Sequence, residues 1–291
     1  MLLQQTINGL ALGMAYALVA VGYSLVFGIL RLVNFSHGSV YAFGAHMVIF
    51  LVGFNFGLVP AILLGVLLTG LLGIFIDKIA LSPLRKKKSP GISSLITTIG
   101  VSYIIQNMLM MFFGSEKKTF PSLFEIHVVN ILGAQLNTMQ LMMFLVSILL
   151  LIVLSVLVKY TKIGLAMRSV EQSQVVSSLM GINTNFIIAF TFFLGGASAA
   201  IASVLISGYY QIVYPSMGFM IGLKAFAAAV LGGIGLFHGS VVGGLVIGVA
   251  EALAATLFGS AYRDSIAFII LILVLIVRPA GLFGKKGIEN V

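Results

Sequence analysis

The feature that most constrains this chain is the length of its uncharged apolar runs. Residues 1–30 carry no charged side chain, and neither do residues 32–76. A helix crosses a bilayer with about 20 consecutive apolar residues, so the first run suffices for one crossing and the second for two. Of all 291 residues, 60% are hydrophobic and only 8% are charged, which is too few charges to cover a water-soluble domain. The chain is therefore predicted to be a polytopic membrane protein.

Charged residues and turn signals divide the chain into about nine apolar segments, or eight if one re-enters without crossing. A turn at Asn55, Gly57 and Pro60 divides the second run. The predicted segments are residues 7–30, two within 32–76, then 90–113, 139–158, 187–207, 219–236, 239–257 and 265–277. We therefore expect an all-α fold with eight or nine transmembrane helices.

Lysine and arginine gather in three connectors, which indicates the orientation of the chain. The basic connectors and tail hold Arg85, Lys86, Lys87, Lys88, Lys159, Lys162, Arg168, Arg278, Lys285 and Lys286. The opposite loops hold only Lys117, Lys118 and Arg263. Basic connectors stay in the cytoplasm, so the C-terminus is predicted to be cytoplasmic. Most of the basic residues behind the net charge of +9 cluster in short connectors rather than along a groove or helix face, which argues against nucleic acid as a partner.

A four-residue sequence occurs twice and predicts an internal repeat. His37-Gly38-Ser39-Val40 recurs at residues 238–241, each time between two apolar segments and followed by a third. Transporters are often built from internal repeats around a central path. We expect a first copy at about residues 7–91 and a second at about 219–284, in the same orientation. Chance is the alternative, because glycine and serine are abundant here.

Polar side chains at membrane depth are candidates for a translocation path or gate. Lys224 lies 14 residues before His238 and Glu251 lies 13 after it, so both are expected about 20 Å from a turn at 237–238. The pair predicts either a gate or a structural bridge between two helices. Asn34 and His37 belong to a polar cluster that could line a path or cap helix ends near the cytoplasmic interface.

No pattern predicts covalent chemistry, a metal site or a cofactor. The chain has no cysteine and no Walker A sequence. The run Gly196-Ala197-Ser198-Ala199 is compatible with the nucleophile of an intramembrane serine protease, with His238 as its base. However, Ser198 lies among small residues that are typical of helix packing in membranes. An enzyme is therefore not expected.

The segment at about residues 159–186 is too polar to cross the membrane. Arg168 and Glu171 are spaced to face each other on a helix, and Gly181 fits the end of one. Val175, Val176 and Leu179 form an apolar stripe. This pattern predicts a short cytoplasmic helix that docks in a groove on a partner, with a solvated connector as the alternative.

Four stretches together resemble the LivH-type permeases of branched-chain amino-acid ABC importers. They are residues 8–39, 161–183, 208–235 and 243–284, so the resemblance covers nearly the whole chain. Two positions depart from the family pattern. Ser39 stands where the family usually has glutamate, and Leu236-Phe237-His238 replaces a turn that often contains proline.

The resemblance implies an inner-membrane subunit that works by alternating access, driven by ATP hydrolysis on two cytoplasmic partner subunits. It also implies a second, related permease subunit and a periplasmic solute-binding protein that delivers a small amino acid. The residues that match the family's ATPase-coupling signature are Gly164, Arg168, Glu171, Gly181 and Asn183. Lys224 and Glu251 match its intramembrane charges. An ion-coupled secondary transporter is the alternative, but it needs coupling carboxylates and Glu251 is the only deep one.

Overall fold

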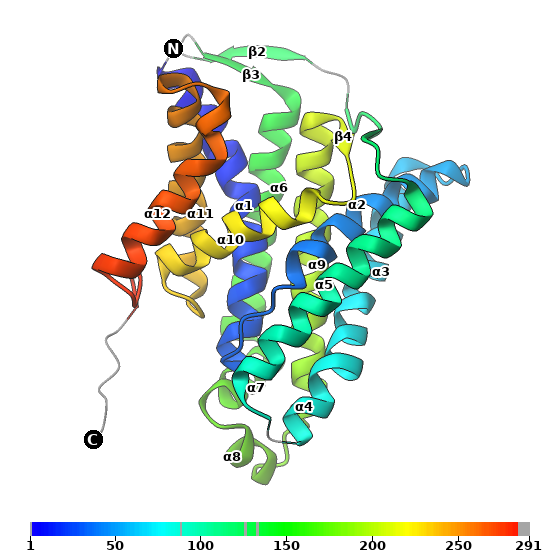
Figure 1. The fold of residues 1–291 in the computed structure, drawn as a ribbon, viewed down its shortest axis with the longest axis vertical. Coiled ribbons are helices and arrows are strands. Elements are labelled where there is room, and N and C mark those ends of the chain that lie inside the picture. The colour runs from blue at the N-terminus through cyan, green and yellow to red at the C-terminus, as the bar shows by residue number, and fades with distance from the viewer. Residues whose placement is uncertain (1, 88, 125–126, 132–133, 285–291) are drawn as a thin grey trace.

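Apolar helices make up most of the molecule (Figure 1). The computed structural model describes residues 2–284 except 88, 125–126 and 132–133, so Lys88, Lys285 and Lys286 of the basic connectors lie outside the described residues. The apolar helices are α1 (Leu2–Leu30), α2 (His37–Gly53), α3 (Leu58–Ile76), α5 (Gly91–Phe113), α6 (Thr138–Tyr160), α9 (Thr184–Tyr210), α10 (Met217–Gly232), α11 (Phe237–Leu257) and α12 (Arg263–Val277). Each predicted apolar segment corresponds to one of them. The all-α polytopic fold is confirmed.

Two of these helices are shorter than a full crossing, and α12, with 15 residues, reaches that length only together with the turn Ser260–Tyr262 before it. Within the described residues, seven helices are long and apolar enough to span a membrane, whereas α2 has 17 residues and α10 has 16. Helix α3 gains length through a π-helical turn (Asp77–Leu81) and α4 (Ser82–Lys86). Arg85 Nη1 lies 2.5 Å from Asp77 Oδ1 and ties these two pieces together. The predicted count of eight or nine crossings thus depends on whether α2 and α10 are counted.

Short elements mark the two ends of the bundle. Helices α7 (Lys162–Gln172) and α8 (Gln174–Leu179) lie at the lower end in Figure 1, together with α4. The upper end carries the N-terminus and the hairpin of β2 (Val128–Ile131) and β3 (Ala134–Asn137), which pairs Val128 with Asn137. Strands β1 (Lys118–Thr119) and β4 (Ile212–Val213) also pair there, antiparallel. The short turn Ser260–Tyr262 leads into α12.

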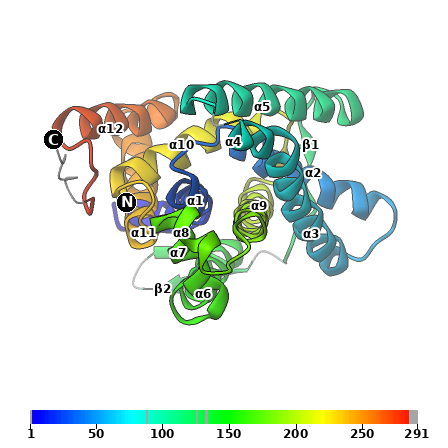
Figure 2. The same cartoon turned by 90° about the horizontal axis from the view of Figure 1, so that it is seen from below.

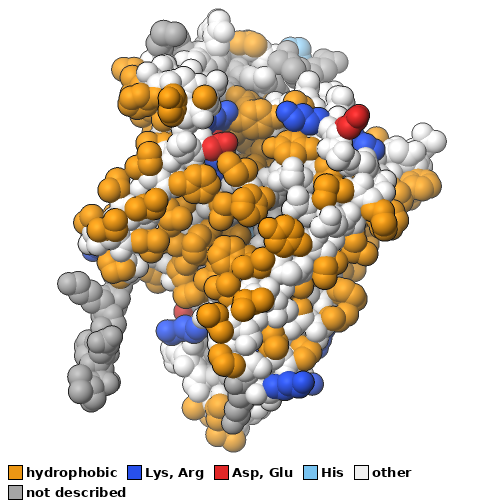
Figure 3. All heavy atoms as spheres, viewed as in Figure 1, with side chains coloured by type: hydrophobic (Ala, Val, Ile, Leu, Met, Phe, Trp, Pro, Cys, Tyr) orange, Lys and Arg blue, Asp and Glu red, His pale blue; other side chains and the backbone are white. Residues whose placement is uncertain are grey.

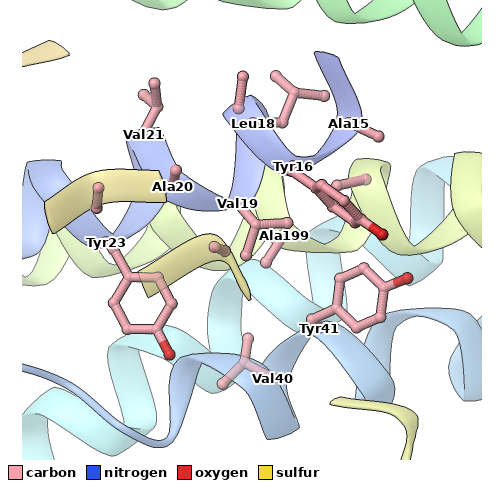
Figure 4. Close-up of a cluster of buried hydrophobic side chains, with 14 of the residues drawn as sticks. Ala15, Tyr16, Leu18, Val19, Ala20, Val21, Tyr23, Val40, Tyr41 and Ala199 are labelled. Carbon is pink, nitrogen blue, oxygen red and sulfur yellow. The ribbon is translucent and has the colours of Figure 1, made fainter. Parts of the chain in front are cut away.

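Helix α1 forms the centre of the core because small residues let its neighbours approach closely. A Cβ atom on Gly9 would lie 2.7 Å from Val249 Cα of α11, and one on Gly244 would lie 2.6 Å from Ala17 Cα of α1. Such backbone contact holds helices together in lipid, where no hydrophobic effect drives them together. On its other sides α1 meets Val40 and Tyr41 of α2 and Ala199 of α9 (Figure 4).

Helices α1 and α9 lead into their successors in the same way. Each is followed by a residue with φ of 54°, Arg31 or Gln211, and the short helices α2 and α10 begin at His37 and Met217, the same interval later. The chain directions are opposite, because α1 ends beside α7 and α8 whereas α9 begins there (Figure 1). Helix α1 packs along α11, and α9 correspondingly packs along α3.

We infer from these correspondences an inverted repeat with an offset of 180 positions, in which α1–α2–α3 matches α9–α10–α11. The predicted copies at about 7–91 and 219–284, with a common orientation, describe a different pairing. His37 opens the short helix α2, whereas His238 lies in the first turn of the long helix α11. Seen from below, α5 and α12 line one edge of the molecule and α6 lies at the opposite edge (Figure 2).

Candidate functional site

A cavity of about 270 Å³ opens at the end of the bundle away from α7 and α8. It forms where α1, α2, α9, α10, α11 and α12 converge. Its charged and polar lining comprises Tyr16, Tyr41, Lys117, Ser207, Tyr210, Tyr214, Lys224, Glu251, Arg263 and Asp264. In Figure 3, acidic and basic side chains gather in the upper part of a largely apolar face, and further charged side chains lie at its lower end. We call this cavity the charged cavity.

Lys224 and Glu251 meet in this cavity, as their depth on antiparallel helices predicts. Lys224 Nζ lies 3.0 Å from Glu251 Oε1, and the two residues are 5% and 1% exposed. Each charge alone costs several kcal/mol at this depth, and the partner offsets part of that cost. The ion pair therefore links α10 to α11.

Arg263 and Asp264 extend the pair into a chain of alternating charge, and sequence analysis missed this role. Lys224 Nζ lies 2.6 Å from Asp264 Oδ1, and Arg263 Nε lies 2.6 Å from Glu251 Oε1. The order Asp264, Lys224, Glu251, Arg263 joins α10, α11 and α12 with no net charge. The depth argument alone does not find this contact, because Glu251 lies eight residues before Gly259 in the turn between α11 and α12, whereas Arg263 lies only four after it.

Tyrosine rings surround these charges. Tyr16 Oη donates a hydrogen bond to Glu251 Oε1 over 3.3 Å, and Lys224 Nζ lies 5.7 Å from the centroid of the same ring. The Arg263 guanidinium lies 5.7 Å from the ring of Tyr210. Cation–π contacts of this kind stabilise a partly desolvated cation by about 0.5–2 kcal/mol. The rings thus help to hold cations that water does not fully solvate.

Besides Arg263 Nε, which lies 2.6 Å from Glu251 Oε1 as an ion pair, three polar atoms of the charged cavity have no hydrogen-bond partner within the part of the chain that the structure describes. They are Tyr41 Oη, Ser207 Oγ and Glu251 Oε2, and none of the three residues is more than 1% exposed. Figure 4 shows Tyr41 and Tyr16 with their hydroxyls turned to the same side. Buried polar atoms are nearly always satisfied, so these atoms are available to bind a polar ligand or water that enters the cavity.

The structure does not bring Asn34 and His37 to the charged cavity. Asn34 Oδ1 accepts hydrogen bonds from Ser36 N (3.1 Å) and Ser36 Oγ (2.6 Å), and so shapes the turn before α2. His37 stacks edge-on against Tyr23, with ring centroids 4.6 Å apart. A second cavity of about 280 Å³, lined by the neighbouring Phe35 and Gly38, lies beside this turn.

The structure does not bring together Ser198 and His238, the pair that the serine protease interpretation predicts. Ser198 lies near the middle of α9, where its Oγ donates to Gly195 O over 2.8 Å. The nearby histidine is His37, because a Cβ on Gly22 would lie 2.7 Å from His37 Nε2 and 2.9 Å from Ser198 Oγ. His238 lies at the start of α11 instead. Among the described residues, no group of three potential metal ligands is present either.

Two of the predicted coupling residues hold the turn between α6 and α7. Arg168 Nη1 donates to the carbonyl oxygens of Val158 and Lys159, the latter over 2.9 Å, and so satisfies the C-terminus of α6. A Cβ atom on Gly164 would collide with the carbonyls of Leu157 and Val158. The two residues thus place α7 against the end of α6.

The other three predicted coupling residues shape the remainder of this segment. Gly181 ends α8 with φ of 84°, and Asn183 Oδ1 accepts from Phe186 N over 3.1 Å at the start of α9. Partial burial raises the pKa of Glu171, and the cations Arg31 and Arg168 act in the opposite direction. All five predicted coupling residues therefore lie in the connection between α6 and α9, at the lower end of the bundle.

Helix α8 presents apolar side chains that nothing in the described chain covers. Val175, Val176, Leu179 and Met180 are 72%, 56%, 82% and 77% exposed. We call these four residues the α8 patch. Sequence analysis identified three of them as a stripe, and the structure adds Met180. An exposed apolar cluster rimmed by polar residues is typical of a protein interaction site.

Comparison with known proteins assigns the chain to a family. Residues 5–275 match the family described as the permease component of the branched-chain amino acid transport system. The chain belongs to this permease family. It is 39% identical to the high-affinity branched-chain amino acid transport system permease protein LivH of Escherichia coli K12, over 99% of this chain and 97% of that protein.

Two further relatives agree with this assignment. The BraD permease protein of Pseudomonas aeruginosa is 39% identical over 99% of this chain and 98% of its own length. The probable LivH of Methanocaldococcus jannaschii is 30% identical over 92% of this chain and 88% of its own. With its long apolar helices, this permease is a multi-pass protein of the inner membrane.

Proposed function

We propose that this permease carries a branched-chain or similar small amino acid across the inner membrane as one subunit of an ABC importer. Alternating access is driven by ATP hydrolysis on two cytoplasmic subunits. A second, related permease completes the membrane unit, and a periplasmic solute-binding protein delivers the amino acid. The observation that carries the proposal is the end-to-end similarity to LivH and BraD, at 39% identity over 99% of the chain.

The lower end of the bundle supports contact with an ATP-hydrolysing partner. The α8 patch stands on a unit that Gly164, Arg168 and Asn183 fix to the ends of α6 and α9. A partner that moves the patch therefore moves two long helices with it. Binding of ATP to one state of the partners would bias the permease towards one of its forms.

The opposite end supports entry of the solute. The charged cavity opens there, and Lys224, Glu251 and Arg263 link α10, α11 and α12 across it. We propose that these contacts form part of the gate, whereas Asn34 and His37 line the path deeper in the bundle. The permease itself catalyses no covalent step.

An ion-coupled secondary transporter is less well supported. Glu251 Oε1 is engaged by both Lys224 and Arg263, so the deep carboxylate is already neutralised by cations. Uptake of L-leucine by the permease alone in energised vesicles would favour that alternative and contradict the ABC proposal.

The absence of cysteine permits a direct test of orientation. Ser178→Cys in α8 and Thr119→Cys in β1 each introduce a single thiol at opposite ends of the molecule. With a membrane-impermeant maleimide, we expect Ser178→Cys to react only in inverted vesicles and Thr119→Cys only in intact spheroplasts. The reverse pattern would place α8 outside the cell and end the proposal.

Docking of the ATPase is tested at the α8 patch. Leu179→Asp places a charge in its centre, and we expect the ATP-binding subunits to be lost from a mild-detergent pull-down. Thr119→Asp, an exposed change at the other end, is the matched control and should leave the complex intact. Retention of the partners by Leu179→Asp would show that the patch does not bind them.

A further inference from the structure

We propose that the charged cavity is a transient binding site for the zwitterionic main chain of an amino acid. This inference rests on the proposed function, and it adds a location and a chemistry of recognition to it. The residues that carry it are Tyr41, Ser207, Glu251 and Arg263, of which only Glu251 was a candidate from the sequence.

The order of charges in the cavity suits a ligand with both signs. Asp264, Lys224, Glu251 and Arg263 alternate along the wall and sum to zero. An anion or a cation alone would bring an unbalanced charge into this neutral cavity. A zwitterion presents an ammonium group to Glu251 and a carboxylate to Arg263 at once, so neither sign is left unpaired. A guanidinium is well suited to hold a carboxylate through two hydrogen bonds.

The unpartnered atoms supply the remaining contacts. Glu251 Oε2 is a buried carboxylate oxygen available to an ammonium donor, and the hydroxyls of Tyr41 and Ser207 can donate to a carboxylate or accept from an ammonium. Leaving such groups unsatisfied costs free energy that an occupant recovers. The three atoms come from α2, α9 and α11, so an occupant would contact both halves of the inverted repeat.

The rest of the wall suits an aliphatic side chain. Ile206, Met217, Met220 and Ile221 line the same cavity. Its volume of about 270 Å³ is close to the lower limit of small-molecule sites, which excludes large ligands. Methionine adapts to side chains of different shape, so the cavity selects the charged main chain more strictly than the side chain.

A transport site must also release its ligand, so we expect weak binding. The assembled importer, purified without its solute-binding protein and placed in nanodiscs, should bind labelled L-leucine with a Kd on the order of 1 mM. Isoamylamine lacks the carboxylate of leucine and isocaproate lacks its ammonium group. Each should compete at least roughly tenfold less well than unlabelled L-leucine, because it brings an unbalanced charge into a neutral cavity and leaves part of the polar lining unsatisfied.

Two variants test the named hydroxyls with little risk to folding. Tyr41→Phe and Ser207→Ala each remove one unpartnered oxygen, and each should weaken L-leucine binding roughly tenfold. Ser147→Ala is the matched control, because Ser147 Oγ is also buried and unpartnered but lies on α6, away from the cavity. This control should bind as the unmodified importer does.

The outcomes separate this inference from the proposed function. If the importer takes up L-leucine with its binding protein and ATP, but neither hydroxyl variant changes direct binding, the cavity is not the site and the proposed function stands. Equal competition by isoamylamine or isocaproate overturns the zwitterion chemistry in the same way. If the complete importer takes up no branched-chain amino acid, the proposed function itself fails.

Discussion

The two ends of this permease leave opposite kinds of group without a partner: polar atoms at the charged cavity and apolar side chains at the α8 patch. At the charged cavity, the atoms without a hydrogen-bond partner are polar and buried, among them Tyr41 Oη, Ser207 Oγ and Glu251 Oε2. At the α8 patch, the polar residues are satisfied by helix ends and the uncovered groups are apolar. Buried polar atoms without partners indicate a small hydrophilic ligand, whereas an exposed apolar cluster indicates a protein surface. The kind of group left without a partner therefore favours a small solute at the charged cavity and a protein partner at the α8 patch.

The largest effect that this comparison predicts is at the buried charges. Glu251→Gln leaves Lys224 and Arg263 facing each other without the carboxylate between them, so we expect a loss of about 3–5 kcal/mol in stability. The measurement is the thermal unfolding midpoint of the detergent-purified permease, together with uptake by the importer.

The double variant sharpens this result. Lys224→Ala leaves the charge chain with an excess negative charge and should impair assembly or transport, and adding Glu251→Gln should restore part of it, because Asp264 and Arg263 then sum to zero again. If both single variants behave as the unmodified permease does, the charge chain contributes nothing and the contrast between the two ends disappears.

A smaller effect is expected at the turn between α6 and α7. Gly164→Ala adds a Cβ against the carbonyls of Leu157 and Val158, so α7 must shift, at a cost of about 1–3 kcal/mol. We expect more ATP hydrolysed per amino acid transported in proteoliposomes. Ser178→Ala, an exposed change on α8, serves as the control. An unchanged ratio for Gly164→Ala would show that the position of α7 does not matter for coupling.

Arg168→Glu tests the same turn through its charge. The glutamate side chain cannot donate hydrogen bonds to the carbonyl oxygens at the C-terminus of α6. It also places a negative charge at the negative end of the α6 dipole, which lowers stability by about 0.3–1 kcal/mol. We expect ATP hydrolysis to persist while uptake falls. Normal coupling in this variant would remove Arg168 from the coupling residues.

The smallest effect concerns Glu171. Its pKa is raised by partial burial, so its charged form is disfavoured in the folded state. Stability should therefore decrease slightly as the pH rises through this raised pKa, and Glu171→Gln should abolish that part of the pH dependence. Unfolding midpoints measured between weakly acidic and neutral pH would show the difference. An identical pH profile in both proteins would contradict this interpretation.

The sequence predicts much of the fold, because length and depth follow from simple geometry. Uncharged runs place each apolar helix, and the rise per residue brings Lys224 to Glu251. The inverted repeat that we infer is harder to recognise in the sequence, since its matching residues are scattered, as in the pairs Val33 with Val213 and Gly38 with Gly218. The more conspicuous match, the four-residue sequence repeated at His37 and His238, predicts a different pairing of segments.

The charged cavity as a whole could not be predicted from the sequence, for a different reason. Tyr41 and Ser207 look like ordinary core residues in the sequence, and their importance arises only where α2 and α9 converge on α11. Asp264 lies at the edge of an apolar segment, where a charge is unremarkable. Such a site forms where several helices meet in three dimensions, and the spacing of residues along one helix does not predict it.

The crossing of α2 and α10 has a consequence for how this permease tolerates mutation. A methyl group on Gly38 would strike the carbonyl of Gly218, and one on Gly218 would strike the carbonyl of Gly38. Damage at one position cannot be repaired by trimming the other, because the opposing residue is already the smallest possible. Second-site suppressors of such a change must therefore arise elsewhere, by moving a whole helix, and we expect them to be scarce.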